Sequence, residues 1–232
     1  MKIVVLAGGL SPERNVSLST GTMVTEALRA LGHRAGLIDL YFGLETGGAD
    51  EAFFDAPVSE AYKKISREAP DLDQVRRGRK GDSPSMFGPG VLELCRMADM
   101  VFLALHGTCG EDGRVQAAFD LMGIPYTGAG YLGSAIAMDK DLTKRMVADV
   151  VSTPGWKTVA YTAADIDRLV ETARLPLVVK PVASGSSIGV SIAHTAEELR
   201  RSLTEGLALG GRTVLEEYIR GPVSYTHLTL PT

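Results

Sequence analysis

The chain has 232 residues, of which 45% are hydrophobic and 22% are charged. This is the balance of an ordinary globular protein, long enough for one large or two small domains. The net charge of −4 argues against nucleic acid as the main partner, and the isolated basic run at 76–80 is expected to be a solvated loop. No apolar stretch approaches the roughly 20 residues of a membrane span. Cys95 and Cys109, the only cysteines, predict no disulfide framework and no metal site, and favour a reducing, cytoplasmic location.

The first 40 residues predict a strand, a helix and a second strand. Residues 2–7, KIVVLA, are continuously apolar, as in a parallel strand covered on both faces. A helix is expected over about 16–31, with Gly32 as its C-terminal stop, and a strand over 33–40. This β-α-β start predicts a doubly wound sheet. The turn at 8–14 lacks the G-x-G-x-x-G spacing, so we expect no nicotinamide site.

Residues 43–90 are rich in glycine, proline and charge, and predict only a short helix near 60–68. A helix over 91–97 and a buried strand over 100–105 follow. A second helix is expected over 113–123, before a short strand and turn.

The strand over 100–105 leads into HGTCGEDG, a loop dense in polar side chains. It places His106, Glu111 and Asp112 after a strand, where open α/β sheets bind their ligands. The spacing is unlike HExxH, so we do not predict a metal site here. Ligand binding and a purely structural role both stay open for this loop.

A change in composition near Gly128 predicts a second unit of antiparallel character. A capping box at Thr195 to Glu198 marks the start of its last helix. The expected helices span about 131–140, 141–151, 165–173 and 195–209, and the expected strands 156–161, 177–179, 188–193 and 212–218.

The stretch 177–193, LVVKPVASGSSIGVSIA, reads as strand, glycine-serine loop and strand. Small residues let backbone N–H groups approach an anion, and hydroxyls and the Lys180 ammonium add donors. A P-loop would need GxxxxGK[ST] leading into a helix, whereas here the lysine precedes the loop and a strand follows. We therefore predict a hairpin tip that closes over phosphates; an ordinary flexible hairpin is the alternative.

Five motifs stand in a fixed order: GGLSPERNVSL, HGTCGEDG, MDKDLTK, LVVKPVASGSSIGVS and VLEEYIRG. The chain thereby resembles the D-alanine–D-alanine ligase family of the ATP-grasp superfamily, over most of 1–222 apart from 43–90. The resemblance implies an α/β fold: an N-terminal doubly wound parallel-sheet domain, 1–128, that binds substrate, then the α+β first half of an ATP-grasp domain, 129–222. It also implies a cytoplasmic ligase, commonly a homodimer, which uses ATP and Mg²⁺ to join two D-alanines through an acyl phosphate for peptidoglycan synthesis.

The matched motifs imply roles for particular residues. Glu13, steadied by Ser186, would hold the ammonium of the first D-alanine as the catalytic pair, with His106 beside the same substrate. The ATP site would comprise Lys140, Lys180, Ser186 and Ser187 at the phosphates, and Glu216, Glu217 and Ile219 around adenine.

Structural roles are the alternative for several of these residues. Glu13 could complement the N-terminus of the helix it precedes. Lys140 could be a surface lysine, and Glu216 and Glu217 an exposed strand end.

The sequence departs from the family pattern near its end. After Pro222 the family has an acidic residue where this chain has Val223, and 223–232 match nothing expected. We therefore expect a truncated ligase, inactive as given, with a tail from about Val223 of foreign or frame-shifted sequence. Its Mg²⁺ ligands are expected in the missing C-terminal part rather than in this chain. Two alternative hypotheses remain: another ATP-grasp carboxylate–amine ligase, and a non-catalytic nucleotide-binding module.

Overall fold

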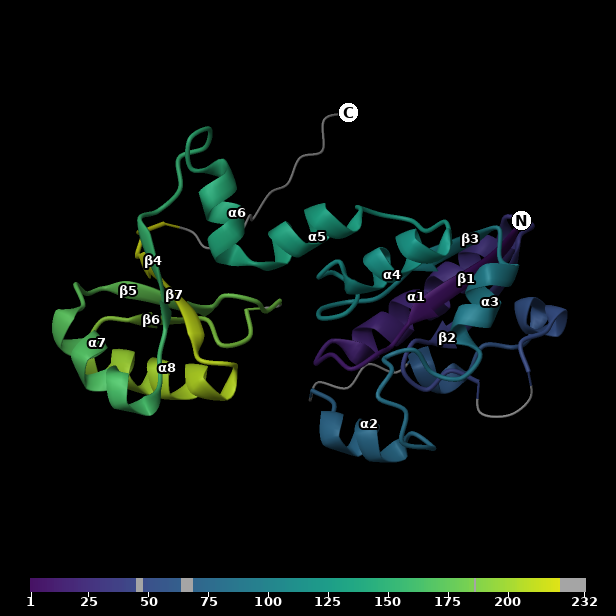
Figure 1. The fold of residues 1–232 in the computed structure, drawn as a ribbon, viewed down its shortest axis with the longest axis horizontal. Coiled ribbons are helices and arrows are strands. Elements are labelled where there is room, and N and C mark those ends of the chain that lie inside the picture. The colour runs from purple at the N-terminus through teal and green to yellow at the C-terminus, as the bar shows by residue number, and fades with distance from the viewer. Residues whose placement is uncertain (45–47, 64–68, 186, 222–232) are drawn as a thin grey trace. The chain divides into compact units, whose positions relative to one another are not determined.

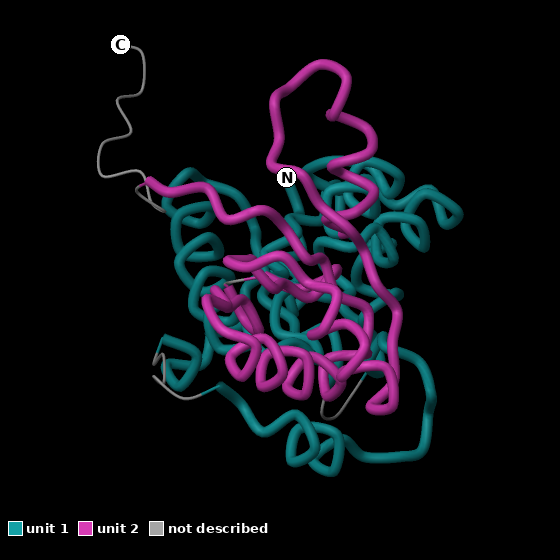
Figure 2. Tube along the Cα trace, turned by 90° about the vertical axis from the view of Figure 1, so that its left-hand side faces the viewer, with its two compact units in different colours: residues 1–138 teal, residues 139–232 magenta. Residues whose placement is uncertain are grey.

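The computed structural model describes residues 1–44, 48–63, 69–185 and 187–221. The chain divides into two compact units, 1–138 and 139–232 (Figure 2). This division follows Met138 rather than Gly128, because helix α5 (Tyr131–Met138) packs on helix α4 (Arg114–Met122) of the first unit. A parallel sheet in one unit and an antiparallel sheet in the other confirm the predicted α/β fold class.

The first unit is built on three parallel strands in the order β2-β1-β3 (Figure 1). They are β1 (Lys2–Ala7), β2 (Arg34–Asp39) and β3 (Met100–Leu103). The central strand is buried from Ile3 to Ala7, which confirms the expectation from its continuous apolar run.

Alternate residues of β1 enter two separate cores, one on each face of the sheet. Val5 packs with Leu18 of α1 (Arg14–Ala30), whereas Leu6 packs in the cluster that contains Phe119 of α4 and Leu94 of α3 (Val91–Met97). Both faces are covered, as a doubly wound arrangement requires. Gly32, at φ +83°, follows the end of α1 as predicted.

The region between β2 and α3 holds more structure than its composition predicted. It contains η1 (Glu51–Asp55), η2 (Glu60–Lys63) and α2 (Leu72–Gly78). Only η2 falls in the predicted helix, whose remainder, 64–68, lies outside the described residues. Helix α2 is capped by Asp71, which accepts from the N–H groups of Asp73 and Gln74.

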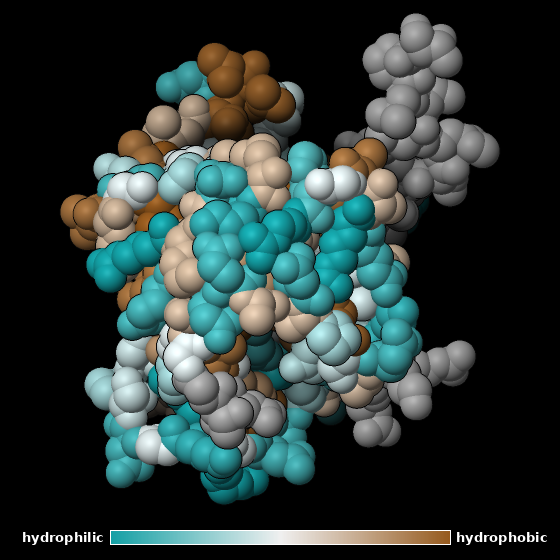
Figure 3. Space-filling view, turned by 90° about the vertical axis from the view of Figure 1, so that its right-hand side faces the viewer, coloured by the Kyte–Doolittle hydropathy of each residue, from teal (hydrophilic) through white to brown (hydrophobic). Residues whose placement is uncertain are grey.

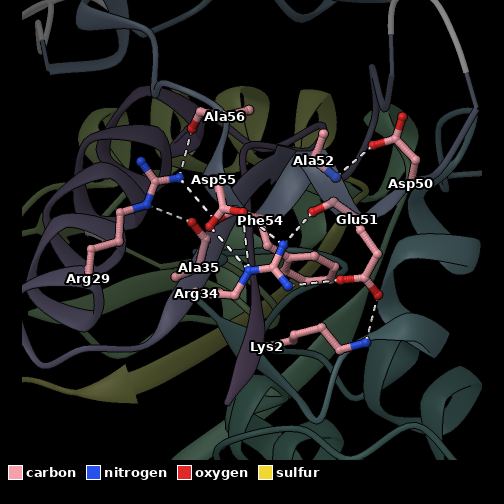
Figure 4. A network of polar contacts seen from close by, with 10 residues as sticks. All are labelled: Lys2, Arg29, Arg34, Ala35, Asp50, Glu51, Ala52, Phe54, Asp55 and Ala56. Atoms are coloured by element: carbon pink, nitrogen blue, oxygen red, sulfur yellow. Dashed lines mark hydrogen bonds and ion pairs between the residues drawn. The ribbon is translucent and has the colours of Figure 1, made fainter.

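An ion-pair network ties η1 to the sheet (Figure 4). Arg34 of β2 pairs with Glu51 and Asp55, and Lys2 of β1 also pairs with Glu51. These pairs are exposed, so solvent screens them and they contribute little to stability. The side chain of Phe54, fully buried among them, is the stronger anchor.

The second unit is an antiparallel sheet in the order β4-β7-β5-β6. Its strands are β4 (Trp156–Ala160), β5 (Leu177–Pro181), β6 (Ser191–Ala193) and β7 (Arg212–Glu217). The predicted hairpin is confirmed, since β5 pairs with β6 across the glycine-serine loop.

Helices α7 (Ile166–Thr172), preceded by η3 (Ala163–Asp165), and α8 (Ala196–Ala208) cover one face of this sheet (Figure 1). Leu199 and Leu203 of α8 pack on Val179 and Leu215 there. The predicted capping box is present at Thr195, whose side chain accepts from the Glu198 N–H. Helix α6 (Lys140–Val147) belongs to the same unit.

The surface drawn in Figure 3 is mainly hydrophilic at its centre, with hydrophobic residues in scattered patches. Among the described residues, no helix combines the length and the apolar character needed to cross a bilayer.

Candidate functional site

The first polar cluster lies where β1 and β3 end, within the first unit. A Cβ atom added to Gly107 would stand 2.5 Å from Ser11 Oγ and 3.0 Å from Glu13 Oε2. The loop after β3 therefore approaches the turn after β1 at a distance that only glycine permits, and Gly107 also has φ +75°. His106 precedes Gly107, so the structure brings His106 and Glu13 to the same edge of the sheet.

The turn that carries Glu13 is held by buried polar groups. Arg14 forms a buried ion pair with Asp39 of β2 and donates to the Gly9 carbonyl at 2.9 Å. Ser17 accepts from the Gly8 N–H at 2.8 Å and donates to the Ala104 carbonyl at 2.7 Å. Sequence reasoning missed these supports, although Arg14 and Ser17 both belong to the GGLSPERNVSL motif.

The His106 loop is folded by its own carboxylates. Glu111 accepts from the Gly107 N–H at 2.6 Å, and Asp112 from the Cys109 N–H at 3.0 Å. Glu111 and Asp112 thus shape the loop backbone. His106 Nε2 is buried and has no hydrogen-bond partner among the described residues.

The second polar cluster lies in the second unit, on the sheet face opposite to Leu215. Glu216 of β7 is opposite Val178 of β5, so Lys180 comes next on the same face. The Glu216 side chain is 6% exposed, and each of its two carboxylate oxygens pairs with a different lysine. Oε1 lies 2.6 Å from Lys144 Nζ, and Oε2 pairs with Lys180.

The charges of this cluster shift the ionisation of its members. Burial raises the pKa of the Glu216 carboxyl, but hydrogen bonds from Lys144 and Lys180 outweigh burial and hold that pKa below its ordinary value. Burial lowers the pKa of the Lys140 ammonium, and the nearby charge of Lys180 lowers it further. Two ammonium groups that repel each other make a place where an anion is stabilised.

Lys140 also connects helix α6 to the glycine-serine loop. Its N–H donates to the Val182 carbonyl at 3.0 Å, and its Nζ donates to the Ser184 carbonyl at 2.7 Å. The alternative of a surface lysine does not describe this half-buried, bonded side chain. Within the loop, Ser187 is exposed at φ +57°, and Ser186 lies outside the described residues.

The residues predicted to surround adenine, at the end of β7 and just beyond it, differ in solvent exposure. Glu216 is 5% exposed, so it is not part of an exposed strand end. Glu217 is exposed, and its carboxylate accepts from the Gly155 N–H at 3.4 Å. Ile219 is 56% exposed.

A cavity of about 760 Å³ also lies in this unit, between the sheet end and α7. Glu217 and Tyr218 line it, whereas Lys180, Lys144 and Glu216 do not. The ion cluster of Lys144, Lys180 and Glu216 is therefore separate from this cavity.

The donors of the second cluster suit a polyphosphate, since ammonium groups and a loop of small residues stabilise anionic oxygens. For a metal ion the described part of the chain offers no comparable site, because no three His, Cys, Asp or Glu side chains there are grouped so that they could hold one.

Two protein-family models match this chain. The family model of the D-ala D-ala ligase N-terminus matches residues 2–129, and the family model of the D-ala D-ala ligase C-terminus matches residues 149–223. The chain belongs to the D-alanine–D-alanine ligase family. Lys140 and Lys144 lie between the two matched ranges, whereas Glu13 and His106 lie in the first, and Lys180 and Glu216 in the second.

Curated ligases of this family are similar along most of the chain. The D-alanine–D-alanine ligase of Lacticaseibacillus casei strain BL23 is 41% identical over 224 residues, which are 95% of this chain and 62% of the relative. That of Aquifex aeolicus is 35% identical over 222 residues, 95% of this chain and 60% of the relative. The chain thus spans about three fifths of the length of these relatives.

Solved ligase structures share the fold. The Bacillus anthracis ligase complexed with ATP is 27% identical with a TM-score of 0.62, over 95% of this chain and 60% of that one. The Coxiella burnetii ligase is 28% identical with a TM-score of 0.63, over 94% of this chain and 64% of that one. The family match ends at 223, and the predicted tail from Val223 lies outside the described residues.

Proposed function

We propose that this chain provides the first-substrate site and part of the ATP site of a ligase that joins two D-alanines, with ATP converted to ADP and phosphate, for peptidoglycan synthesis. One observation carries the proposal: Lys140 of α6 donates to the Ser184 carbonyl of the glycine-serine loop, and Lys180, on the strand that leads into this loop, pairs with the buried Glu216 carboxylate. Such fixed cations stabilise a transferring phosphoryl group better than mobile ones, because they need no reorganisation. The ATP complex of the Bacillus anthracis relative supports this assignment.

In the first unit, Glu13 and His106 are proposed to bind the first D-alanine. A carboxylate suits the substrate ammonium, and the unpartnered His106 nitrogen suits a polar group of the same small molecule. Gly107 keeps the two loops close enough to share one amino acid. The family resemblance assigns Ser186, which lies outside the described residues, to the same catalytic pair.

In the second unit, Lys140 and Lys180 are proposed to hold the ATP phosphates, with Ser186 and Ser187 closing over them. Glu216 would accept a hydrogen bond from the adenine amino group, beside Glu217 and Ile219. Mg²⁺ would supply further positive charge between the phosphates, and we expect its carboxylate ligands outside these 232 residues. The homodimer and the cytoplasmic location stay predictions of the family resemblance.

The proposal is tested with purified protein expressed from its complete reading frame. We expect phosphate release that requires D-alanine, ATP and Mg²⁺, and D-alanyl-D-alanine detected by mass spectrometry, with L-alanine as the control. ATP binding without dipeptide would instead identify a nucleotide-binding module. A product from another acid would identify a different carboxylate–amine ligase.

A further inference from the structure

Lys144 has an environment unlike that of the two other lysines of the second cluster. Its Nζ donates to Thr153 Oγ1 at 2.6 Å and to the Pro154 carbonyl at 3.0 Å, and lies 2.6 Å from Glu216 Oε1. An ammonium has three donors, so these three acceptors saturate it. The side chain is 11% exposed and lies 4.8 Å from the ring centroid of Trp156.

Lys180 is bound more loosely. Its side chain is 27% exposed, and Glu216 is its ion-pair partner in the described part of the chain. Because an ammonium can make three hydrogen bonds, Lys180 has donors left for another anion. Lys180 can therefore exchange partners, whereas Lys144 cannot do so without leaving two neutral acceptors unpaired.

We propose that Lys144 is a positioning residue: a permanent counter-ion that keeps the Glu216 carboxylate ionised and oriented toward a purine amino group, and so selects adenine over guanine. This inference rests on the proposed function, because it assumes that Glu216 meets the nucleotide base. Lys144 itself contacts no phosphate, since its three donors are already used.

The energetic reason is the burial of Glu216. A carboxylate that is 6% exposed becomes costly when it loses its cation. If Lys180 turns to the phosphates, Lys144 remains and compensates the charge, so Lys180 can leave without stranding Glu216. With Lys144 as its counter-ion, Glu216 can accept a hydrogen bond from the base while Lys180 binds the phosphates.

The selectivity follows from hydrogen-bonding capacity. An ionised carboxylate only accepts hydrogen bonds. The 6-amino group of adenine donates to it, whereas the 6-oxo group of guanine would place two acceptors in contact. A neutral Glu216 would carry a proton and could satisfy either base, so discrimination depends on the counter-ion that keeps Glu216 charged.

The other charged groups around Glu216 belong to two elements, β5 and α6. Lys180 reaches Glu216 from β5, and Lys144 reaches it from α6. Asp141, also on α6, is bound to Arg145 and to Trp156 Nε1. Asp141 is thereby neutralised by its own partners, which leaves Lys144 and Lys180 as the cations that govern Glu216.

The first test is a double-variant comparison by titration calorimetry with ATP and GTP, on protein from the complete reading frame. We expect Lys144→Met to weaken ATP binding about tenfold and to reduce the preference for ATP over GTP. The double variant Lys144→Met/Glu216→Gln should bind ATP no more weakly than Glu216→Gln alone, because the counter-ion has no carboxylate left to hold. Lys157→Met, an exposed lysine of the same sheet, is the matched control and should change neither affinity.

An additive result would overturn the inference: a double variant about tenfold weaker than Glu216→Gln would show that Lys144 acts through Thr153 and Pro154 or on the ligand itself. This comparison does not need the single Lys144→Met variant, so it holds even if that variant fails to fold. Retention of the full ATP-over-GTP preference in a folded Lys144→Met protein would also overturn the base-selecting role.

A second test needs no nucleotide. NMR titration of the carboxyl carbon of Glu216 should show a pKa that rises more in Lys144→Met than in Lys180→Met. The reverse order would overturn the assignment of Lys144 as the permanent counter-ion. If the wild type binds no ATP, the proposed function and the base-selecting role both fail, while this titration separately decides whether Lys144 holds Glu216.

Discussion

The two polar clusters are fixed in place by different means. In the first unit, glycines and main-chain hydrogen bonds bring Glu13 and His106 to one edge of the parallel sheet, as Gly107 and the Gly8–Ser17 bond show. In the second unit, charges hold one another, with Glu216 between Lys144 and Lys180. The proposed amino-acid site thus depends on backbone shape, and the proposed phosphate site depends on a set of cations.

The largest effect is expected from Lys180→Met in the ionic cluster. Loss of a preorganised cation beside the phosphates should lower kcat/KM for ATP about 100- to 1000-fold. Steady-state kinetics of phosphate release measure it, with Lys157→Met as control. An unchanged rate would show that Lys180 only neutralises Glu216.

Glu13→Gln is the matching change in the first cluster. It removes the negative charge while keeping the size of the side chain, so the KM for the first D-alanine should rise about 10- to 100-fold. The KM for ATP should be unchanged, and the exposed Glu26→Gln variant of the same helix should change neither constant. A raised KM for ATP with normal D-alanine use would contradict the separation of the two clusters.

Asp141→Asn probes how strongly charge stabilises the second unit. A hydrogen bond from Trp156, with help from Arg145, outweighs burial and lowers the pKa of Asp141 from 3.8 to about 2. Because the folded-state pKa lies below the unfolded one, ionised Asp141 stabilises the fold above about pH 4, and this contribution is lost as the pH falls toward 2. Urea unfolding should show a loss of about 2 kcal/mol at pH 7 that disappears toward pH 2.

The control for this change is Asp149→Asn, an exposed aspartate just beyond α6, which should leave stability nearly unchanged. A difference between wild type and Asp141→Asn that stays constant from pH 7 to pH 2 would mean that shape rather than charge is responsible.

The smallest effect concerns the backbone of the first cluster. Gly107→Ala and Gly32→Ala both force a side chain into positive φ, at +75° and +83°. Of these two positions, only Gly107 has neighbours that the added carbon meets, Ser11 Oγ and Glu13 Oε2, whereas at Gly32 none of the described residues lies within 4 Å. Thermal unfolding should show Gly107→Ala less stable than Gly32→Ala by about 1 kcal/mol. Equal losses would mean that strain alone matters and that Glu13 is free to move.

Much of the fold was predictable because its signals are local. The helix over 91–97, the end of α1 before Gly32 and the capping box at Thr195 each depend on residues a few positions apart. The hairpin of β5 and β6 around the glycine-serine loop was likewise predictable, whereas anion binding by Lys180 stays a prediction. Between 43 and 90 the local signals were weak, and there η1 and α2 were missed.

The sequence by itself determined most elements of both units and the identity of the groups that we propose to bind D-alanine and phosphate. The tertiary structure decided which of those groups have partners: Lys144 with Glu216, Trp156 with Asp141, and Arg14 with Asp39. These pairs join distant parts of the chain, and they form only once strand register and helix packing bring their elements together. Burial then sets the strength of each ionic interaction. The different environments of Lys144 and Lys180 are therefore a property of the folded chain and not of the MDKDLTK and LVVKP motifs.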